Sequence, residues 1–363
     1  MAGSTDAVPA ASSNGAVACL APIATAAPPK LMGKSKIASL TCLGSAISCA
    51  SLVVSVYLLP FWTDVIGVGP QFMGIVIICA KVAEAVSVVS AGIFSDSCMI
   101  RFGRRRPFLI FCIPAAVLYA LLFNPPQDVV SSGGAASAWV LTVGIAFYGV
   151  WPYLTVCHSS WCAEYCRDYV ERNVLYGFRF FFGTIGTITG AVLPLIVAAA
   201  CGLSEQVLDE KIRINHYVGI SVAVIIAVVS LLVLAFVSEN SRQNSDSSVW
   251  KALVSWVLQA FGAIRHSRTV RVHMLMSFLY DIALAYAVSF LPYMTSRVHK
   301  LRTTLVLGSY VVMSLICIPV WLKVSQYYEK NHVLSAACAS QSGFMMAAGL
   351  VIYSYDLPLL PIT

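Results

Sequence analysis

Long apolar runs separated by short polar connections dominate this chain. A helix that crosses a bilayer needs about 20 apolar residues, and runs of that length recur from residue 37 onward. The pattern predicts nine spans, with boundaries at 37–61, 70–95, 107–124, 138–160, 176–200, 216–238, 272–293, 304–323 and 333–355. The fold class that we expect is therefore an all-α polytopic membrane protein.

The composition favours the same class. Hydrophobic residues make up 59% of the 363 residues and charged residues 11%, whereas soluble domains carry about 25% charged residues. The mean hydropathy is +0.82. So few charges could not cover the surface of a soluble fold, so the lipid bilayer is the expected surrounding. The net charge of +7 then bears on orientation in the membrane, and nucleic acid is not expected as a partner.

The basic residues predict how the chain is oriented. If the N-terminus lies in the cytoplasm, 16 Lys and Arg residues fall on the cytoplasmic side and 5 on the other side. Cytoplasmic loops of membrane proteins carry an excess of Lys and Arg. A multi-pass membrane protein with a cytoplasmic N-terminus is therefore predicted. The loop 294–302 is a local exception, because its three basic residues would lie outside.

Composition divides the chain into four parts. Residues 1–35 are rich in Ala, Ser and Pro, which predicts a disordered cytoplasmic tail. Residues 36–238 hold six spans and form an N-terminal bundle. Residues 239–270 form a cytoplasmic linker, whose apolar residues recur at helical spacing and predict an amphipathic interfacial helix. Residues 271–363 hold three spans, so the second bundle is expected to be incomplete.

Enzyme and metal chemistry find no support in the sequence. The 12 cysteines show no CxxC pairs at zinc spacing, and most lie inside apolar runs, where free cysteine behaves as a small hydrophobe. The chain carries no P-loop, GxSxG or HExxH motif. We therefore expect neither an enzyme nor a resident cofactor, although a coupling ion, H+ or Na+, remains possible.

A charged motif joins the second and third spans in the stretch GIFSDSCMIRFGRRRP. Its residues are Gly92, Asp96, Gly103, Arg104, Arg105, Arg106 and Pro107. Gly92 is expected to let another helix approach closely, and Asp96 to pair with a helix N-terminus or an arginine. The arginines are expected to meet anionic lipid, helix C-termini and carboxylates of the neighbouring bundle. Alternatively, they mark the cytoplasmic face and do nothing more.

This motif resembles the loop signature of the major facilitator superfamily, and within it the glycoside–pentoside–hexuronide:cation symporters, the melibiose-permease-like group. Three stretches extend the resemblance: FWTDVIGV at 61–68, KVAEAVSVVSAGIFSD at 81–96, and WCAEYCRDYVERNVLYGFRFFF at 161–182. Plant-type sucrose transporters carry a similar RFGRRRP loop. The resemblance implies a two-bundle transporter of this superfamily, here with a truncated second bundle, whose halves alternate access to a central site.

Lys81 and Glu84 lie one turn apart in the second span. A lone charge at mid-bilayer costs about 2.5–3.5 kcal/mol on insertion scales, and opposite charges at this spacing relieve one another. The resemblance puts Glu84 where the family has a cation-binding aspartate, with Ser87 close by and Val88 in place of a second carboxylate. So few oxygen ligands favour a proton over sodium. The alternative is a structural pair that locks this helix to a neighbour.

The resemblance also suggests a solute site. Tyr153, Trp161 and Arg179 stand where sugar permeases of the family have an aromatic, an indole and an arginine facing the sugar. Aromatic rings stack on sugars, and arginine donates hydrogen bonds to hydroxyls. Ser48 and Cys157 replace two aspartates that bind galactosides, so melibiose itself is not expected. Each aromatic residue could instead serve packing.

Two further groups of charged residues are candidates. The loop after the fourth span carries Glu164, Arg167, Asp168, Glu171 and Arg172. It resembles the family's salt-bridge cluster that holds the two bundles closed on the cytoplasmic side, although a solvated loop would look similar. Asp281, midway through the seventh span, is expected to be a buried carboxylate and hence a candidate for the solute site.

Together these features predict a secondary active transporter. It would carry a small-molecule substrate, with a sugar or glycoside favoured, by symport with a cation, for which a proton is favoured over sodium. A carrier of lysolipids or other amphiphiles in the same superfamily is one alternative. A truncated membrane protein that does not transport is another.

Overall fold

The computed structural model describes residues 34–97, 105–165, 169–203, 207–237, 259 and 261–293, with isolated residues between 316 and 340. The helices are α1 (Lys34–Thr41), α2 (Leu43–Pro60), the π-helix η1 (Phe61–Val65), α3 (Pro70–Ser97), the 3₁₀-helix η2 (Arg106–Phe111), α4 (Cys112–Phe123), α5 (Gln127–Val130), α6 (Gly133–Tyr165), α7 (Tyr169–Cys201), α8 (Leu208–Phe236) and α10 (Arg268–Tyr293). The described part of the chain contains no strand. The predicted all-α class is therefore confirmed.

Six helical segments in the described residues are long and apolar enough to cross a membrane. They are Ser35–Val65, Pro70–Ser95, Arg106–Phe123, Gly133–Tyr165, Val174–Cys201 and Leu208–Phe236. These segments coincide with the first six predicted spans. Helix α10 covers the seventh predicted span, whereas the predicted tail, most of the linker and most of the last two spans lie outside the described residues.

Several boundaries differ from the predictions. Helix α8 begins at Leu208, eight residues before the predicted start at 216. Helix α6 begins at Gly133 and ends at Tyr165, so it exceeds the predicted span 138–160 by five residues at each end, because a helix continues past the apolar stretch that crosses the bilayer. The first span is not one continuous helix. Its regular helix is interrupted at Cys42 between α1 and α2, and it ends in the π-helix η1, which follows directly on Pro60.

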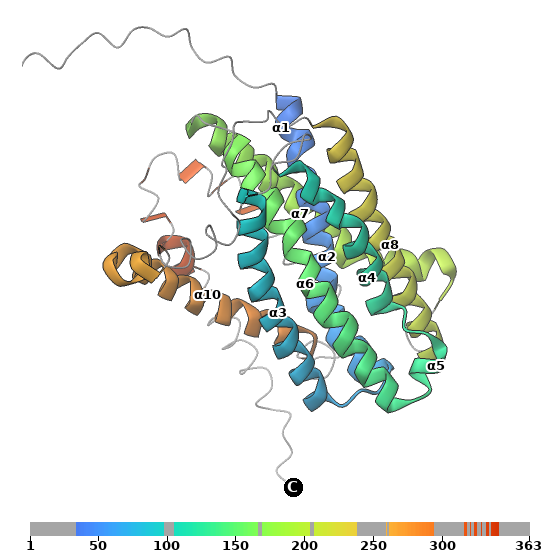
Figure 1. Ribbon diagram of the computed structural model, residues 1–363. Helices are drawn as coiled ribbons and strands as arrows, with labels where there is room; N and C mark the ends of the chain where they lie inside the picture. The colour runs from blue at the N-terminus through green and yellow to red at the C-terminus, as the bar shows by residue number, and fades with distance from the viewer. Residues whose placement is uncertain are drawn as a thin grey trace, which may run out of the picture.

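The long helices run side by side as a bundle (Figure 1), with α3 at one edge and α8 at the other. Helix α2 packs with α7, α3 with α6, and α4 with α8. Counted as spans one to six, these pairs are 1–5, 2–4 and 3–6. If spans 1, 2 and 3 are exchanged with spans 4, 5 and 6, pair 1–5 becomes pair 4–2, and pair 3–6 is unchanged. This is the pattern of two related three-helix repeats, which are common in transporter folds.

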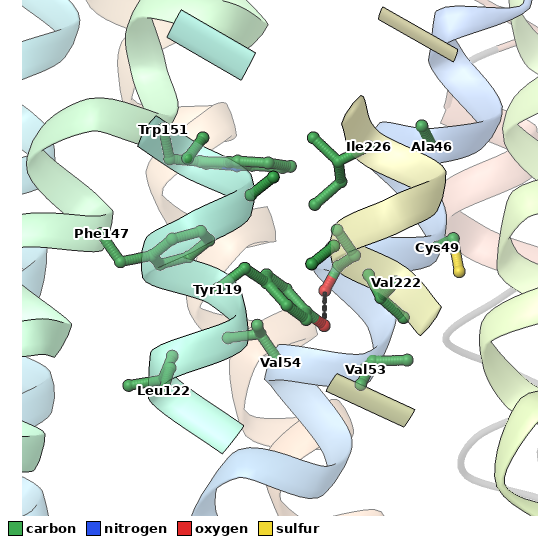
Figure 2. Packing of buried hydrophobic residues seen from close by; sticks show 14 of the residues in the cluster. Ala46, Cys49, Val53, Val54, Tyr119, Leu122, Phe147, Trp151, Val222 and Ile226 are labelled. Atoms are coloured by element: carbon green, nitrogen blue, oxygen red, sulfur yellow. Dashed lines mark hydrogen bonds between the residues drawn. The ribbon is translucent and has the colours of Figure 1, made fainter. Parts of the chain in front are cut away.

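The core of the bundle is apolar and aromatic. Figure 2 shows Tyr119 of α4 beside Phe147 and Trp151 of α6. The Tyr119 ring is fully buried, and its hydroxyl donates a hydrogen bond to the Ala50 carbonyl of α2 at 3.3 Å. A buried phenol needs such a partner. This bond therefore fixes the first span against the third in the middle of the bundle.

Candidate functional site

Lys81 and Glu84 form an ion pair within the membrane-spanning helix α3. The Lys81 Nζ lies 2.6 Å from the Glu84 Oε2, with 59% and 27% of the two side chains exposed among the described residues. The same Nζ stands 4.8 Å from the centre of the Tyr148 ring on α6, which is within range for a cation–π contact. A carboxylate and an aromatic face thus hold one ammonium group.

Ser87 lies one turn beyond Glu84 and is partly buried against α6. Its hydroxyl is 3.8 Å from the place that a Cβ on Gly149 would take. Among the described residues, no group of three or more His, Cys, Asp and Glu could hold a metal ion. The carboxylate of this candidate site is that of Glu84, which is paired with Lys81.

Tyr153 lies farther along α6 and contacts α3 and the start of the third span. Its hydroxyl is 2.8 Å from the Ser90 hydroxyl of α3, and its ring stacks on Phe111 with the centroids 4.9 Å apart. These contacts support the packing alternative for this residue. In the described part of the chain, no hydrogen bond or ring contact joins Tyr153 to the other three residues predicted for the solute site, Trp161, Arg179 and Asp281.

Arg179 belongs to α7, and its side chain is hydrogen-bonded to helix α6. Its guanidinium donates a hydrogen bond to the Ser159 hydroxyl at 2.7 Å, and its backbone packs against Gly44 of α2. Ser48 lies on the same α2–α7 contact, against Gly183. A partly buried guanidinium with further donors suits the recognition of hydroxyl groups.

Trp161 and Cys157 lie inside the bundle. Trp161 is 2% exposed and belongs to the hydrophobic core, and Cys157 is 1% exposed. The expectation that the indole faces the solute is therefore corrected for this conformation, because the ring is packed among apolar side chains and presents no face for stacking.

Asp281 of α10 is exposed among the described residues, so the expectation of a buried carboxylate is also corrected. Helix α10 contacts α2, whereas the Lys81–Glu84 pair lies on α3. The structure describes no hydrogen bond or ion pair of Asp281, and it does not bring this carboxylate to the pair.

The charged motif lies at the end of the bundle where α3 and α6 end. Arg105 forms an ion pair with Glu164 at 2.7 Å, and Arg106 donates hydrogen bonds to the Leu234 carbonyl near the end of α8. The predicted contact of an arginine with a helix C-terminus is thus present. The carboxylate of Glu164 belongs to the same bundle as Arg105, and the predicted contact with a neighbouring bundle involves residues that are largely outside the described part of the chain. Pro107 occupies the first turn of η2, as expected.

The other motif residues give a mixed result. A Cβ on Gly92 would meet no described atom within 4 Å, so the predicted close helix approach at Gly92 is not observed. Arg172 is exposed and Glu171 partly buried near the start of α7. The side chain of Asp96 and the residues Gly103, Arg104, Arg167 and Asp168 lie outside the described residues.

Sequence reasoning missed the closest helix contact, between α2 and α7. A Cβ on Gly186 would overlap the Ser45 carbonyl oxygen, and a Cβ on Gly190 would lie 2.9 Å from the Cys49 carbonyl oxygen. Gly183, Gly186 and Gly190 follow one face of α7, and the last two form a GxxxG pattern, which indicates close packing of membrane helices. That spacing could have predicted the contact. Tyr148 was missed as well, and no local signal marks it.

Comparison with known proteins identifies the family of the chain. A family model described as MFS/sugar transport protein matches residues 41–359, which is most of the chain. The sequence resemblance to a transporter family of the major facilitator superfamily is thereby confirmed, as is the multi-pass membrane location.

Individual relatives match over shorter stretches. The isoprimeverose transporter of Lactiplantibacillus pentosus is 27% identical over 53% of this chain and 38% of its own length. The putative glycoside/cation symporter YagG of Escherichia coli is 28% identical over 53% of this chain and 41% of its own length. The sodium-dependent lysophosphatidylcholine symporter 1 of Xenopus tropicalis is 25% identical over 49% and 33%. The chain thus spans less than half the length of these relatives.

Proposed function

Because the chain belongs to the MFS/sugar transport protein family, we propose that it acts as a secondary active transporter that carries a sugar or glycoside together with a cation. The Lys81–Glu84 pair in a membrane-spanning helix is the observation that carries this proposal. Charges at such depth are costly and usually mark ion or substrate pathways. The names of two relatives, an isoprimeverose transporter and a glycoside/cation symporter, support the solute class and the coupling.

The geometry suggests how coupling would work. A proton that binds Glu84 would neutralise its carboxylate and end the ion pair, and the Lys81 ammonium group would stay on the Tyr148 ring, which it already contacts at 4.8 Å. One titratable carboxylate suffices for a proton, whereas sodium prefers several oxygen ligands. Arg179, held on Ser159, would donate hydrogen bonds to hydroxyl groups of the solute. Alternating access would follow from rocking of two halves.

The same proposal places the N-terminus in the cytoplasm. The positive-inside rule supports this orientation. The arginines Arg105 and Arg106 lie at the ends of α6 and α8, and this is also the end of the bundle at which α1 begins, because consecutive spans run in opposite directions.

A transport assay with purified protein in liposomes tests the proposal. We expect uptake of a labelled glycoside driven by an inward proton gradient, abolished by Glu84→Gln at unchanged protein level. Asp128→Asn is the matched control, because Asp128 lies in the short helix α5 outside the six candidate spans. Uptake that changes neither with the proton gradient nor with the Glu84→Gln substitution would overturn the coupling role of Glu84.

The similarity to the sodium-dependent lysophosphatidylcholine symporter 1 supports a second candidate, an amphiphile as the solute. Competition separates the two candidates. Excess disaccharide should suppress uptake of the labelled glycoside, whereas suppression by lysophosphatidylcholine alone would favour the amphiphile. A complete lack of uptake for both classes would favour a membrane protein that does not transport.

A further inference from the structure

The first span is interrupted near one end, and side chains hold the interruption. Helix α1 ends at Thr41 and α2 begins at Leu43. The Thr41 hydroxyl and the Cys42 thiol donate hydrogen bonds to carbonyl oxygens of the preceding turn, at 2.8 Å and 3.1 Å. Carbonyl groups left free at a helix end must find other donors, above all inside a membrane.

The Leu40 carbonyl obtains its donor from another helix. His158 of α6 lies 2.9 Å from this oxygen through its Nε2, and both residues are fully buried. Because a carbonyl oxygen can only accept, the Nε2 must carry the proton. The Nδ1 of His158 meets no hydrogen-bond partner among the described residues. The contact of His158 with Leu40 therefore joins α6 to the interruption inside the bundle.

The interruption also contacts the backbone and the side-chain stem of Arg179, the residue that we assign to the solute. A Cβ on Gly44, at the start of α2, would lie 3.5 Å from the Arg179 carbonyl oxygen and 3.8 Å from its Cγ. The Arg179 guanidinium donates to the hydroxyl of Ser159, which directly follows His158 on α6. Two consecutive residues of α6 thus make the two contacts. His158 bonds to the interruption, and Ser159 accepts the hydrogen bond from the Arg179 guanidinium.

We propose that His158 is a positioning residue for solute binding. Its hydrogen bond to Leu40 fixes the start of α2, and the start of α2 in turn confines the stem of Arg179 against Ser159. This inference rests on the proposed function, in which Arg179 binds the solute. His158 itself does not touch the solute.

Three substitutions at one position test the inference. The amide nitrogen of His158→Gln reaches about as far as the Nε2 and keeps the donor, whereas the amide of His158→Asn stops near the Nδ1 position and His158→Leu has no donor. For Asn and Leu we expect the apparent KM for the solute to rise about tenfold, as for a lost buried hydrogen bond, with kcat changed less than about twofold. Gln should retain the wild-type KM.

Labelling of Cys42 provides a second readout that does not require transport. This thiol is partly buried at the interruption, so a maleimide should modify it faster in the Asn and Leu variants than in the wild type and the Gln variant. Cys201 is exposed at the end of α7 and should react equally in all four proteins. If the wild type shows no uptake, the proposed function fails while labelling still tests His158.

Two results would overturn the inference. One is Gln and Leu variants with the same KM and the same Cys42 labelling rate, because the donor then has no role. The other is a Leu variant whose labelling rate rises while its KM stays at the wild-type value, because the interruption then opens without affecting Arg179. Should the Leu variant not fold, the same comparison applies to Asn and Gln.

Discussion

Two helix pairs hold this bundle together by different means. Between α2 and α7, glycines bring the backbones into direct contact, so that a Cβ on Gly186 would overlap the Ser45 carbonyl. Between α3 and α6, polar groups meet, with Lys81 over the Tyr148 ring and Ser90 bonded to Tyr153. A direct backbone contact allows only one distance between the two helices, whereas polar side chains can change their hydrogen-bond or ion-pair partners while the helices move. We therefore expect α2–α7 to behave as a rigid pair, and α3–α6 to carry the chemistry that changes during transport.

The largest expected effect is on the rigid pair. Gly186→Ala places a methyl group where the Ser45 carbonyl lies, so the two helices must separate along their length. Overpacking typically costs about 1–3 kcal/mol, and the higher helix propensity of alanine, about 1 kcal/mol, offsets only part of it. We expect a clear loss of thermal stability in detergent, measured by the unfolding of the purified protein.

Gly177→Ala is the matched control for this prediction. Gly177 lies on the same helix, and a Cβ there would meet no described atom within 4 Å. The control should be as stable as the wild type or slightly more stable. Equal destabilisation by the two substitutions would show that the α2–α7 contact is not tight, and the contrast between the two pairs would disappear.

The sequence predicted the bundle better than it predicted the site. Spans follow from the length of apolar runs, and a bilayer imposes that length on every helix, so six of them were located closely. The interruption at Cys42 was missed, and the donor that meets the Leu40 carbonyl there, His158, lies 118 residues away in the chain. No local pattern reports such a contact.

Within the site, the sequence predicted contacts between residues that are close in the chain, but it did not predict which face of a helix is buried. Lys81 and Glu84 lie three residues apart, so helical geometry alone brings them together, as the structure shows. Trp161 was assigned to a solute-facing surface, but which side of α6 is buried depends on how several helices pack around it. The 2% exposure of Trp161 is thus determined by the packing of the bundle and could not be predicted from the neighbouring sequence.

The next effect is expected from the ion pair on α3. Lys81→Met leaves Glu84 without its ammonium partner, and the loss in unfolding free energy should be about 1–2 kcal/mol, because a lone charge in a membrane-spanning helix costs up to about 2.5–3.5 kcal/mol and protonation of the carboxyl relieves part of that cost. The double variant Lys81→Met with Glu84→Gln should recover most of that loss, since no unpaired charge remains. Thermal unfolding of all four proteins gives the coupling energy. Strictly additive effects of the two substitutions would mean that the pair is not formed in the folded protein.

The smallest effect is expected from the aromatic partner of the pair. Tyr148→Leu removes the ring beneath the Lys81 ammonium group, and a cation–π contact at such a partly exposed site contributes about 0.5 kcal/mol. Tyr148→Phe keeps the ring and should unfold at the wild-type temperature. If the ring also receives Lys81 when Glu84 is protonated, Leu should slow proton-driven uptake more than it lowers stability, whereas Phe should leave uptake unchanged. Equal uptake by the Leu and Phe variants would mean that Tyr148 serves packing alone. The Lys81 ammonium group would then have no second functional partner on α6, and the contrast between the α3–α6 and α2–α7 pairs would be lost.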